Sequence, residues 1–418
     1  MNCQLHAMTK TRSRYVLTVL VILGVAAFAT GLVRAPERAW YNLLLHNFYF
    51  LSLSMMGAIF VAMHTLARAG WPTVFRRVPE AMLGYLPAGT LLTFALFFGM
   101  HSIYHWTHHA TVEADSLLQE KHALLNVPGF FIRMLVYLGL WSVLARILVR
   151  QSRRQDSAGE PTTLPTEENA TESVGDAGNT RSRSPARSAV IVLVARNVRV
   201  SAAFLIIFAI TFSLASIEWV MSLEPHWFST LFPWYVLSSA FASGVALITI
   251  LVLTLRRRGF FPEINRHHLH DLGKYVFALS CFWGYLWFSQ YMLIWYTNLP
   301  EETSYYILRG GSWSGLFLTN AVLNLGVPFL LLLPASWKQS PRLLLVVCLI
   351  VFVGHWLDFY LMVMPSLMTS GPVFGLYELG VGIGVCALFL LCFDAVLRRH
   401  PLLPKNDPFF EESLRHHG

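Results

Sequence analysis

Three carboxylates and one histidine lie inside long apolar stretches of the chain, where charged side chains are rare. Glu218 lies about one turn from the predicted outer end of its stretch, and Glu378 lies about 8 Å from the outer end of the last one. Asp358 follows His355 by three residues, so the two side chains share one helix face. A carboxylate at membrane depth costs about 2.5–3.5 kcal/mol on insertion scales, so it usually has a polar partner or a function. We expect the four residues to line one hydrated cavity that opens outward and handles protons.

Two other interpretations of these residues remain open at this point. The acids could form interhelical hydrogen bonds, which contribute about 0.6 kcal/mol each on average in a membrane bundle. They could also serve quinol oxidation, which requires a proton acceptor beside the quinol hydroxyl and an apolar slot for its ring and tail. A quinol is therefore a possible ligand.

A second, weaker group of polar residues falls near the predicted inner ends of the apolar stretches. It consists of His64, Asp271, Lys274 and Asp394. Each of these side chains is close enough to the headgroups to extend to water, which is the simpler interpretation. The alternative is an inner proton site that communicates with the outer one. The candidates for a relay between the two groups are His355, Ser280 and Tyr285.

Histidines cluster between two of the stretches. His101, His105 and His108 would share one face of a continuous helix, and His109 follows. The spacing H-x-x-H-H resembles one box of the membrane di-iron desaturases, and a single zinc or copper ion is a further possibility. The second group, formed by His267, His268 and His270, falls on the opposite membrane side, and no third box exists. We therefore expect no metal site.

The composition excludes most other classes of protein. Of the 418 residues, 55% are hydrophobic and only 13% are charged, whereas soluble domains have about 25% charged residues. The five cysteines form no C-x-x-C motif, so neither an iron–sulfur cluster nor a c-type haem is expected, and we predict that this chain binds no cofactor.

Ten stretches are long enough to cross a bilayer, which requires about 20 residues. The fold class predicted from them is an all-α polytopic membrane protein. The ten predicted spans are Tyr15–Val33, Leu43–Leu66, Met82–Tyr104, Val127–Val149, Val200–Met221, Trp234–Leu255, Lys274–Tyr296, Gly315–Leu333, Leu343–Met364 and Val373–Val396.

Lysine and arginine predict the orientation. With both termini in the cytoplasm, 25 of the 31 basic residues fall in inner segments and 4 in outer ones, as the positive-inside rule requires. The first span follows basic residues but ends without a small-residue cleavage site, so we expect it to be retained. The polar segment 151–188 has almost no apolar residues and is predicted to be disordered. The predicted division is 1–150 with four spans, the loop 151–188, 189–400 with six spans, and a cytoplasmic tail, 401–418.

Several segments resemble the large membrane subunits of alternative complex III, a bacterial quinol:cytochrome c oxidoreductase, which belong to the NrfD/PsrC-like family. These segments are residues 216–230, 268–275, 282–303 and 354–365. Within that family, residues 71–82 and the short cytoplasmic ends look most like the F subunit (ActF), whereas the loop 151–188 departs from the family pattern.

The resemblance implies an arrangement, a location and partners. It implies two four-helix bundles plus two additional helices in the bacterial inner membrane. The implied partners are a paralogous NrfD-like membrane subunit, a periplasmic iron–sulfur subunit and c-type cytochrome subunits. An F-type subunit would conduct protons without a working quinol site, whereas a C-type subunit would oxidise quinol. A transporter or architectural scaffold is the remaining alternative.

Overall fold

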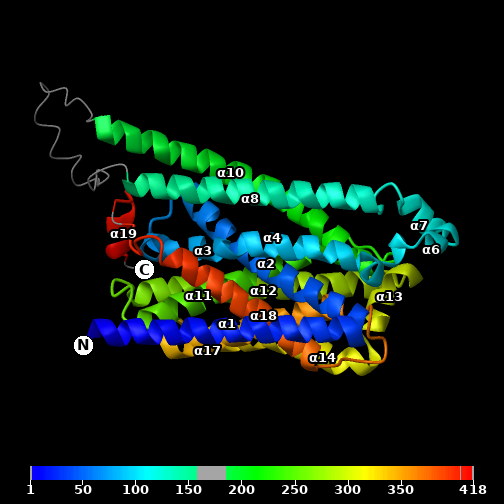
Figure 1. The fold of residues 1–418 in the computed structure, drawn as a ribbon. Coiled ribbons are helices and arrows are strands. Elements are labelled where there is room, and N and C mark those ends of the chain that lie inside the picture. Colours follow the sequence, from blue (N-terminus) through cyan, green and yellow to red (C-terminus); the bar gives the residue numbers. More distant parts are fainter. Residues whose placement is uncertain (1, 158–184, 405, 417–418) are drawn as a thin grey trace, which may run out of the picture.

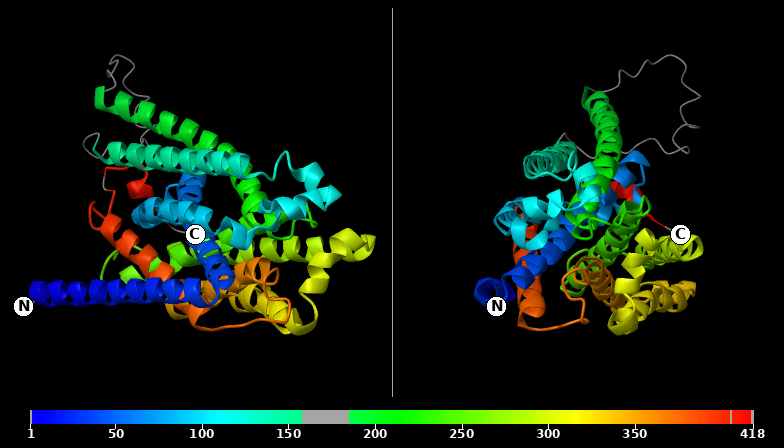
Figure 2. Two further views of the ribbon diagram at one scale, coloured as in Figure 1. Left: turned by 45° about the vertical axis from the view of Figure 1, so that its right-hand side comes forward. Right: turned by 90° about the vertical axis from the view of Figure 1, so that its right-hand side faces the viewer.

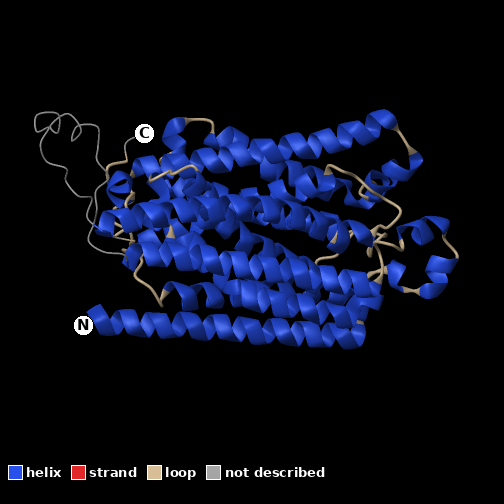
Figure 3. Ribbon diagram, turned by 90° about the horizontal axis from the view of Figure 1, so that it is seen from above, coloured by secondary structure: helices blue, strands red, loops and turns tan. Residues whose placement is uncertain are grey.

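The computed structural model describes residues 2–157, 185–404 and 406–416 (Figure 1). These residues form helices and connecting loops, with no strand among them (Figure 3). The all-α fold class is therefore confirmed for the described part of the chain. Long helices run roughly along one axis, as expected where lipid leaves the backbone to satisfy its own hydrogen bonds.

The long helices have the following bounds: α1 Asn2–Arg34, α2 Pro36–Leu66, α4 Leu86–Ala95, α8 Val127–Ser157, α10 Pro185–Trp219, α11 Phe232–Arg257, α12 Arg266–Thr297, α17 Pro341–Val363 and α18 Leu376–Leu397. Shorter helices extend or connect them: α3 Arg77–Met82, α5 Met100–Ile103, α6 His109–Glu113, α7 Ser116–Lys121, α13 Pro300–Leu308, α14 Ser314–Ala321, α15 Val327–Leu332, α16 Ala335–Lys338 and α19 Phe410–Leu414. A π-helical segment, η8 (Val322–Gly326), joins α14 to α15, and a 3-10 helix, η1 (Trp71–Phe75), precedes α3.

Nine helical segments in the described residues are long and apolar enough to cross a membrane. The predicted span Lys274–Tyr296 is not among them, although it lies within the 32-residue helix α12. Its many tryptophans and tyrosines make α12 less apolar than its neighbours. The chain is a multi-pass membrane protein, while the count of ten spans and the cytoplasmic placement of the termini stay predictions.

Helix α2 lies at the centre of the molecule. It is buried almost all round from Ala39 to Ala62, as expected for a helix that contacts other helices on every side. It packs against α4, α8 and α10 on one side and against α11 and α17 on another. Helices α11, α12, α15 and α17 also pack against one another, and α1 pairs with α18 (Figure 2). Gly24 and Gly384 make that pair close, because a Cβ on Gly24 would lie 2.5 Å from the Cα of Gly384.

Both described ends of the chain lie at one end of the bundle, which we call the terminal end (Figure 1). The first part of the predicted disordered loop, residues 151–157, lies there but is helical and closes α8. The prediction of disorder was wrong for these residues because Gln151, Ser152 and Gln155 are buried against neighbouring helices. Residues 185–188 begin α10, and the rest of the loop, 158–184, lies outside the described residues.

Candidate functional site

Asp358 is the most completely enclosed of the predicted acids. Its side chain has no exposed surface, and four neutral groups donate hydrogen bonds to its two carboxylate oxygens. Oδ1 accepts from the Tyr235 hydroxyl and from Asn320 Nδ2 at 2.7 Å. Oδ2 accepts from Ser239 Oγ at 2.7 Å and from Trp283 Nε1 at 2.9 Å. Five residues on four helical segments, α11, α12, α14 and α17, thus form one site, which we call the Asp358 site.

Helix spacing places these donors. Tyr235 and Ser239 are four residues apart on α11, so both face α17. Asn320 is the penultimate residue of α14, just before the π-helical segment η8, a deviation that is frequent at functional sites. Asn324, inside η8, donates to Asn320 Oδ1 at 2.6 Å. Gly354 permits this approach, because a Cβ there would lie 2.4 Å from Asn324 Oδ1.

Ser239 connects Asp358 to His355. Its Oγ lies 2.7 Å from Asp358 Oδ2 and 3.0 Å from His355 Nδ1. A hydroxyl group can accept one proton while it donates its own. A proton on His355 Nδ1 can therefore pass to Asp358 through Ser239. Nε2 of His355 is buried and has no hydrogen-bond partner among the described residues, so the described part of the path ends at this atom.

The donor set suits a carboxylate that changes its protonation state. With Asp358 ionised, the four donors fill the four acceptor positions of its oxygens. Trp283 and Asn320 can only donate through the atoms they present, but the hydroxyls of Tyr235 and Ser239 can rotate and accept instead. Protonation of Asp358 therefore requires only the rotation of a hydroxyl. It leaves no cation without its partner, because none of the four donors is charged.

Glu378 and Glu218 each pair with an arginine instead. Two guanidinium nitrogens of Arg38 donate to the two oxygens of Glu378, each at 2.6 Å, and Asn42 Nδ2 donates to one of them at 3.0 Å. Arg133 Nε donates to Glu218 Oε1 at 2.5 Å. The hydrogen-bond partners of the three acids do not overlap. The structure therefore gives no support for one shared cavity: Glu378 is bonded from α2, Glu218 from α8, and Asp358 from α11, α12 and α14.

Sequence reasoning missed both arginines. Arg133 stood inside a predicted span, which was itself a signal, since a buried cation needs a counter-charge. Arg38 stood just before the second predicted span and was counted only for topology. Arg38 precedes its partner by 340 residues, so the pairing is invisible to local spacing.

A further buried ion pair, which the sequence reasoning also missed, lies at the end of the bundle opposite the terminal end. Arg309 is 2% exposed and donates to Glu224 Oε1 at 2.8 Å. It also donates to the carbonyls of Leu361 and Met362, in the last turn of α17. Burial opposes the charge of Arg309, but the nearby Glu224 carboxylate outweighs it and raises the pKa of Arg309 above its ordinary value. The pair therefore stays charged and holds the end of α17, the helix that carries Asp358.

The predicted inner group does not form one cluster. Asp271 contacts Lys274 at 2.5 Å and His416 at 2.6 Å, whereas Asp394 pairs with Arg14 at 2.7 Å and with Arg398. His64 donates from its Nδ1 to the Phe60 carbonyl oxygen at 2.7 Å.

The predicted relay between the two groups is not assembled as expected. Tyr285 is 65% exposed on the outer surface of α12, so it cannot connect buried groups. Ser280 is buried, but its hydroxyl has no hydrogen-bond partner in the described part of the chain. Of the three relay candidates, only His355 lies in the Asp358 site.

The dense histidine cluster does not lie on one helix. The chain is extended at Tyr104, between α5 and a short 3-10 turn at His105–Thr107, so the assumption of a shared helix face was wrong. His108 Nε2 lies 3.0 Å from the carbonyl oxygen of His101. Across the described residues, no group of three or more histidine, cysteine or acidic side chains is arranged to hold a metal ion.

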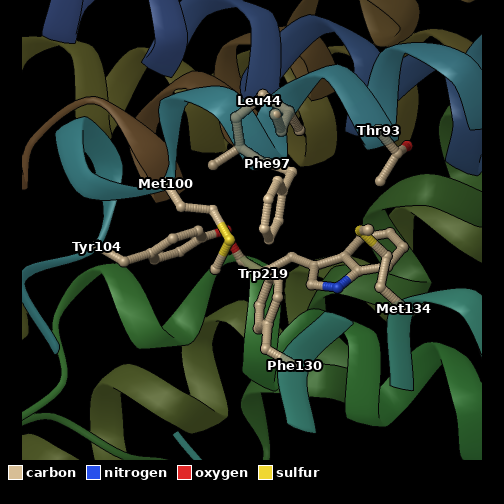
Figure 4. A pocket seen from close by; sticks show the side chains of 9 residues that line it. Leu44, Thr93, Phe97, Met100, Tyr104, Phe130, Met134 and Trp219 are labelled. Carbon is tan, nitrogen blue, oxygen red and sulfur yellow. The ribbon is translucent and has the colours of Figure 1, made fainter. Parts of the chain in front are cut away.

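A small apolar cavity, with room for about one water molecule, has Trp219, the residue after Glu218, in its wall (Figure 4). Two buried polar atoms near it, Trp219 Nε1 and Glu218 Oε2, have no hydrogen-bond partner among the described residues. The cavity as it stands is too small for a ring-shaped ligand, although its lining is almost entirely apolar and aromatic. Its lining residues are Leu44, Thr93, Leu96, Phe97, Met100, Tyr104, Phe130, Met134 and Trp219.

Comparison with known proteins identifies one domain. Residues 174–372, slightly less than half of the chain, match the family model of polysulphide reductase, NrfD. No curated protein matches the chain. The matched region contains Glu218, His355 and Asp358, whereas Glu378 follows it. This region of the chain is therefore similar to the NrfD family, and the residues of the Asp358 site all lie within it.

Proposed function

We propose that this chain is an integral membrane subunit of a respiratory quinol:cytochrome c oxidoreductase of the alternative complex III type, and that it takes up and releases protons at Asp358. The similarity to the NrfD family supports a redox complex, because subunits of this family usually assemble with iron–sulfur and other redox subunits. The proposed partners are a paralogous NrfD-like subunit, a periplasmic iron–sulfur subunit and c-type cytochromes, in the bacterial inner membrane.

The single observation that carries the proton role is the path Asp358–Ser239–His355. A buried carboxylate whose donors are all neutral can be protonated without breaking an ion pair. The hydroxyl of Ser239 lies within hydrogen-bond distance of both titratable groups. General acid–base groups must lie within about 2.6–3.2 Å of the atom that gives or receives the proton, and both of these distances fall in that range.

The role of the other acids in proton transfer stays a weaker proposal. Glu378 and Glu218 are each held by a guanidinium group, which favours the ionised form and opposes proton uptake. The residues of the predicted inner group lie near the terminal end but not together. Asp394 pairs with Arg14 and Arg398, apart from the ion pair of Asp271 with Lys274. We therefore assign proton exchange first to Asp358 and His355, and treat the other residues as supports for the bundle.

Substitution of Asp358 by asparagine tests the proposal. Asp358→Asn keeps the shape of the side chain but removes the titrating group. In the assembled complex reconstituted into vesicles, we expect normal subunit content and at least about tenfold slower proton release coupled to quinol oxidation. Glu37→Gln is the matched control, because Glu37 is exposed and makes no hydrogen bond or ion pair among the described residues. Unchanged proton release in Asp358→Asn would refute the role.

A second candidate function is favoured by the apolar and aromatic lining of the small cavity at Trp219, which would have to widen to admit the ring of a quinol. In that case this chain would itself oxidise quinol, with Glu218 as the proton acceptor. Trp219→Phe removes the indole N–H and keeps the apolar lining. Labelling by a photoreactive quinone at Phe97 or Met134, competed by quinol and weakened in Trp219→Phe, would support this function. Labelling confined to the partner subunit would exclude it.

A further inference from the structure

The C-terminal segment, residues 401–416, folds onto the terminal end of the bundle and does not extend from it as a free tail. Asp407 is 4% exposed and accepts hydrogen bonds from Arg76 and, at 3.4 Å, from Gln155 Nε2. Ser413 is fully buried, donates to the Trp71 carbonyl at 2.7 Å and accepts from the Val74 N–H at 3.2 Å. These two polar residues thus attach the segment to the connection between α2 and α3 and to the end of α8.

The same segment also contacts the start of α12. His416 Nε2 lies 2.6 Å from Asp271 Oδ2, and the His416 carbonyl accepts from Asn265 Nδ2 at 2.9 Å. The His416 ring packs edge-on against His268, with the ring centroids 5.1 Å apart. The segment therefore joins three parts of the chain that the sequence separates: the α2–α3 connection, the end of α8 and the beginning of α12.

Two small cavities lie beneath this contact, on either side of His64. Both are lined by His64, Ala69 and Arg76, and Phe409 of the C-terminal segment lines one of them. His64 is 6% exposed, and its Nε2 has no hydrogen-bond partner in the described structure. An imidazole nitrogen that is buried beside a polar cavity is a natural partner for water. Arg76, which borders both cavities, is held in place by Asp407 of the C-terminal segment.

We propose that the C-terminal segment is a clamp that closes the His64 cavities to the aqueous phase at the terminal end. Release of Asp407 would free Arg76, and withdrawal of Phe409 would remove one wall of a cavity, so water would reach His64. The ligand admitted is water. The inference does not depend on the proposed proton role, because access to the cavities can be measured without any redox activity.

Thiol accessibility tests the clamp in the full-length chain. Thr73→Cys places a reporter thiol in the wall of the first cavity at a position that is 3% exposed, and the chain without this substitution gives the background of its natural cysteines. The purified protein in lipid nanodiscs is treated with a charged, water-soluble maleimide. We expect slow labelling of Thr73→Cys and about tenfold faster labelling when Asp407→Asn or Ser413→Ala is added, because local opening exposes the site.

Glu411→Gln is the matched control within the same segment. Glu411 is exposed, and its side chain makes no hydrogen bond or ion pair among the described residues, so its substitution should leave the labelling rate unchanged. Equal labelling rates with and without Asp407→Asn and Ser413→Ala would overturn the clamp, as would an equal increase in Glu411→Gln. If Asp407→Asn lowers the yield of monodisperse protein, Ser413→Ala decides the question by the same measurement.

Discussion

Asp358 and Glu378 are two fully buried carboxylates with opposite surroundings. Asp358 accepts hydrogen bonds from two hydroxyls, an indole and an amide, all neutral. Glu378 accepts from both ends of the Arg38 guanidinium, from Asn42 and from the Gly375 N–H. Neutral donors stabilise the ionised carboxylate but still allow it to be protonated. A guanidinium in bidentate contact favours the ionised acid strongly.

The difference separates a group that can exchange protons from one that holds helices together. Protonation of Glu378 would leave Arg38 without its counter-charge, at a cost typical of a broken buried ion pair. Protonation of Asp358 requires only that Ser239 or Tyr235 rotate its hydroxyl. Depth in the membrane is therefore a poor guide to function, and the charge of the partners is a better one.

The largest effect is expected at Glu378. Glu378→Ala should lower the free energy of unfolding by about 3 kcal/mol, at the lower end of the range for a broken buried pair because Arg38 is 25% exposed. The yield of monodisperse protein after stepwise heating in detergent measures the loss. An Arg38→Ala, Glu378→Ala double variant should recover part of it, since neither charge is then left alone. A tolerated Glu378→Ala would contradict the structural role.

Removal of the bridging hydroxyl should have the next largest effect. Ser239→Ala leaves Asp358 with three donors and interrupts its contact with His355. We expect about tenfold slower proton release, because the path loses its middle group, with little loss of folded protein. Ser238→Ala is a suitable control, since the Ser238 hydroxyl bonds only the Tyr235 carbonyl. Equal rates for the two serine variants would remove the relay from the mechanism.

Acid should weaken the start of α12, which lies outside the predicted span. Burial, with a contribution from the neighbouring His416, lowers the pKa of His268 to about 4, while Asp271 opposes this and His267 adds to it. The unfolded chain then binds a proton more readily than the folded one. Stability is full well above pH 6.5 and falls as the pH drops toward 4, by about 2 kcal/mol at pH 5.

Thermal unfolding at pH 7 and pH 5 measures this acid sensitivity of His268. His268→Gln should flatten the dependence, because the substituted chain has no imidazole to protonate at this position. A dependence that is equally steep in His268→Gln would assign the effect to another group. His267→Gln provides a control on the adjacent residue.

The smallest effect is expected at Tyr285, which the structure places on the outer surface of α12. Tyr285→Phe should change neither proton release nor thermal stability, because its hydroxyl has no hydrogen-bond partner among the described residues and 65% of the residue is exposed. The same two assays measure this. A clear loss of proton release would return Tyr285 to the relay and weaken the contrast between buried and exposed groups.

The sequence predicted the helices better than their contacts. Apolar length identifies membrane helices because the bilayer thickness is fixed: five of the ten predicted spans lie inside helices that are long and apolar enough to cross a membrane, and four more overlap such helices to within a few residues. Helix periodicity also bears on the wrong inclusion of Tyr285 in the predicted relay. Tyr285 is two residues after Trp283, which places the two side chains on opposite faces of α12. Because Trp283 faces Asp358, Tyr285 had to face away.

The partners of the acids could not be predicted in this way. Arg38 and Glu378 are distant in sequence, and no spacing rule connects residues on different helices. The same holds for Tyr235, Ser239 and Asn320, which look like ordinary polar residues in apolar helices. The C-terminal segment was predicted only as a cytoplasmic tail, without contacts to the rest of the chain. Its burial depends on complementary groups, such as Arg76 and Trp71, that only the folded chain brings together.

The central position of α2 has a consequence for biosynthesis. This helix leaves the ribosome early, yet Asn42 receives its partner Glu378 only after 336 further residues have been made. Until α18 is inserted, the Asn42 amide bonds the Arg38 carbonyl of its own helix, but the Arg38 guanidinium lacks the carboxylate of Glu378. We therefore expect α2 to stay beside an insertase or chaperone until translation is nearly complete, because an unpaired cation is costly in hydrocarbon.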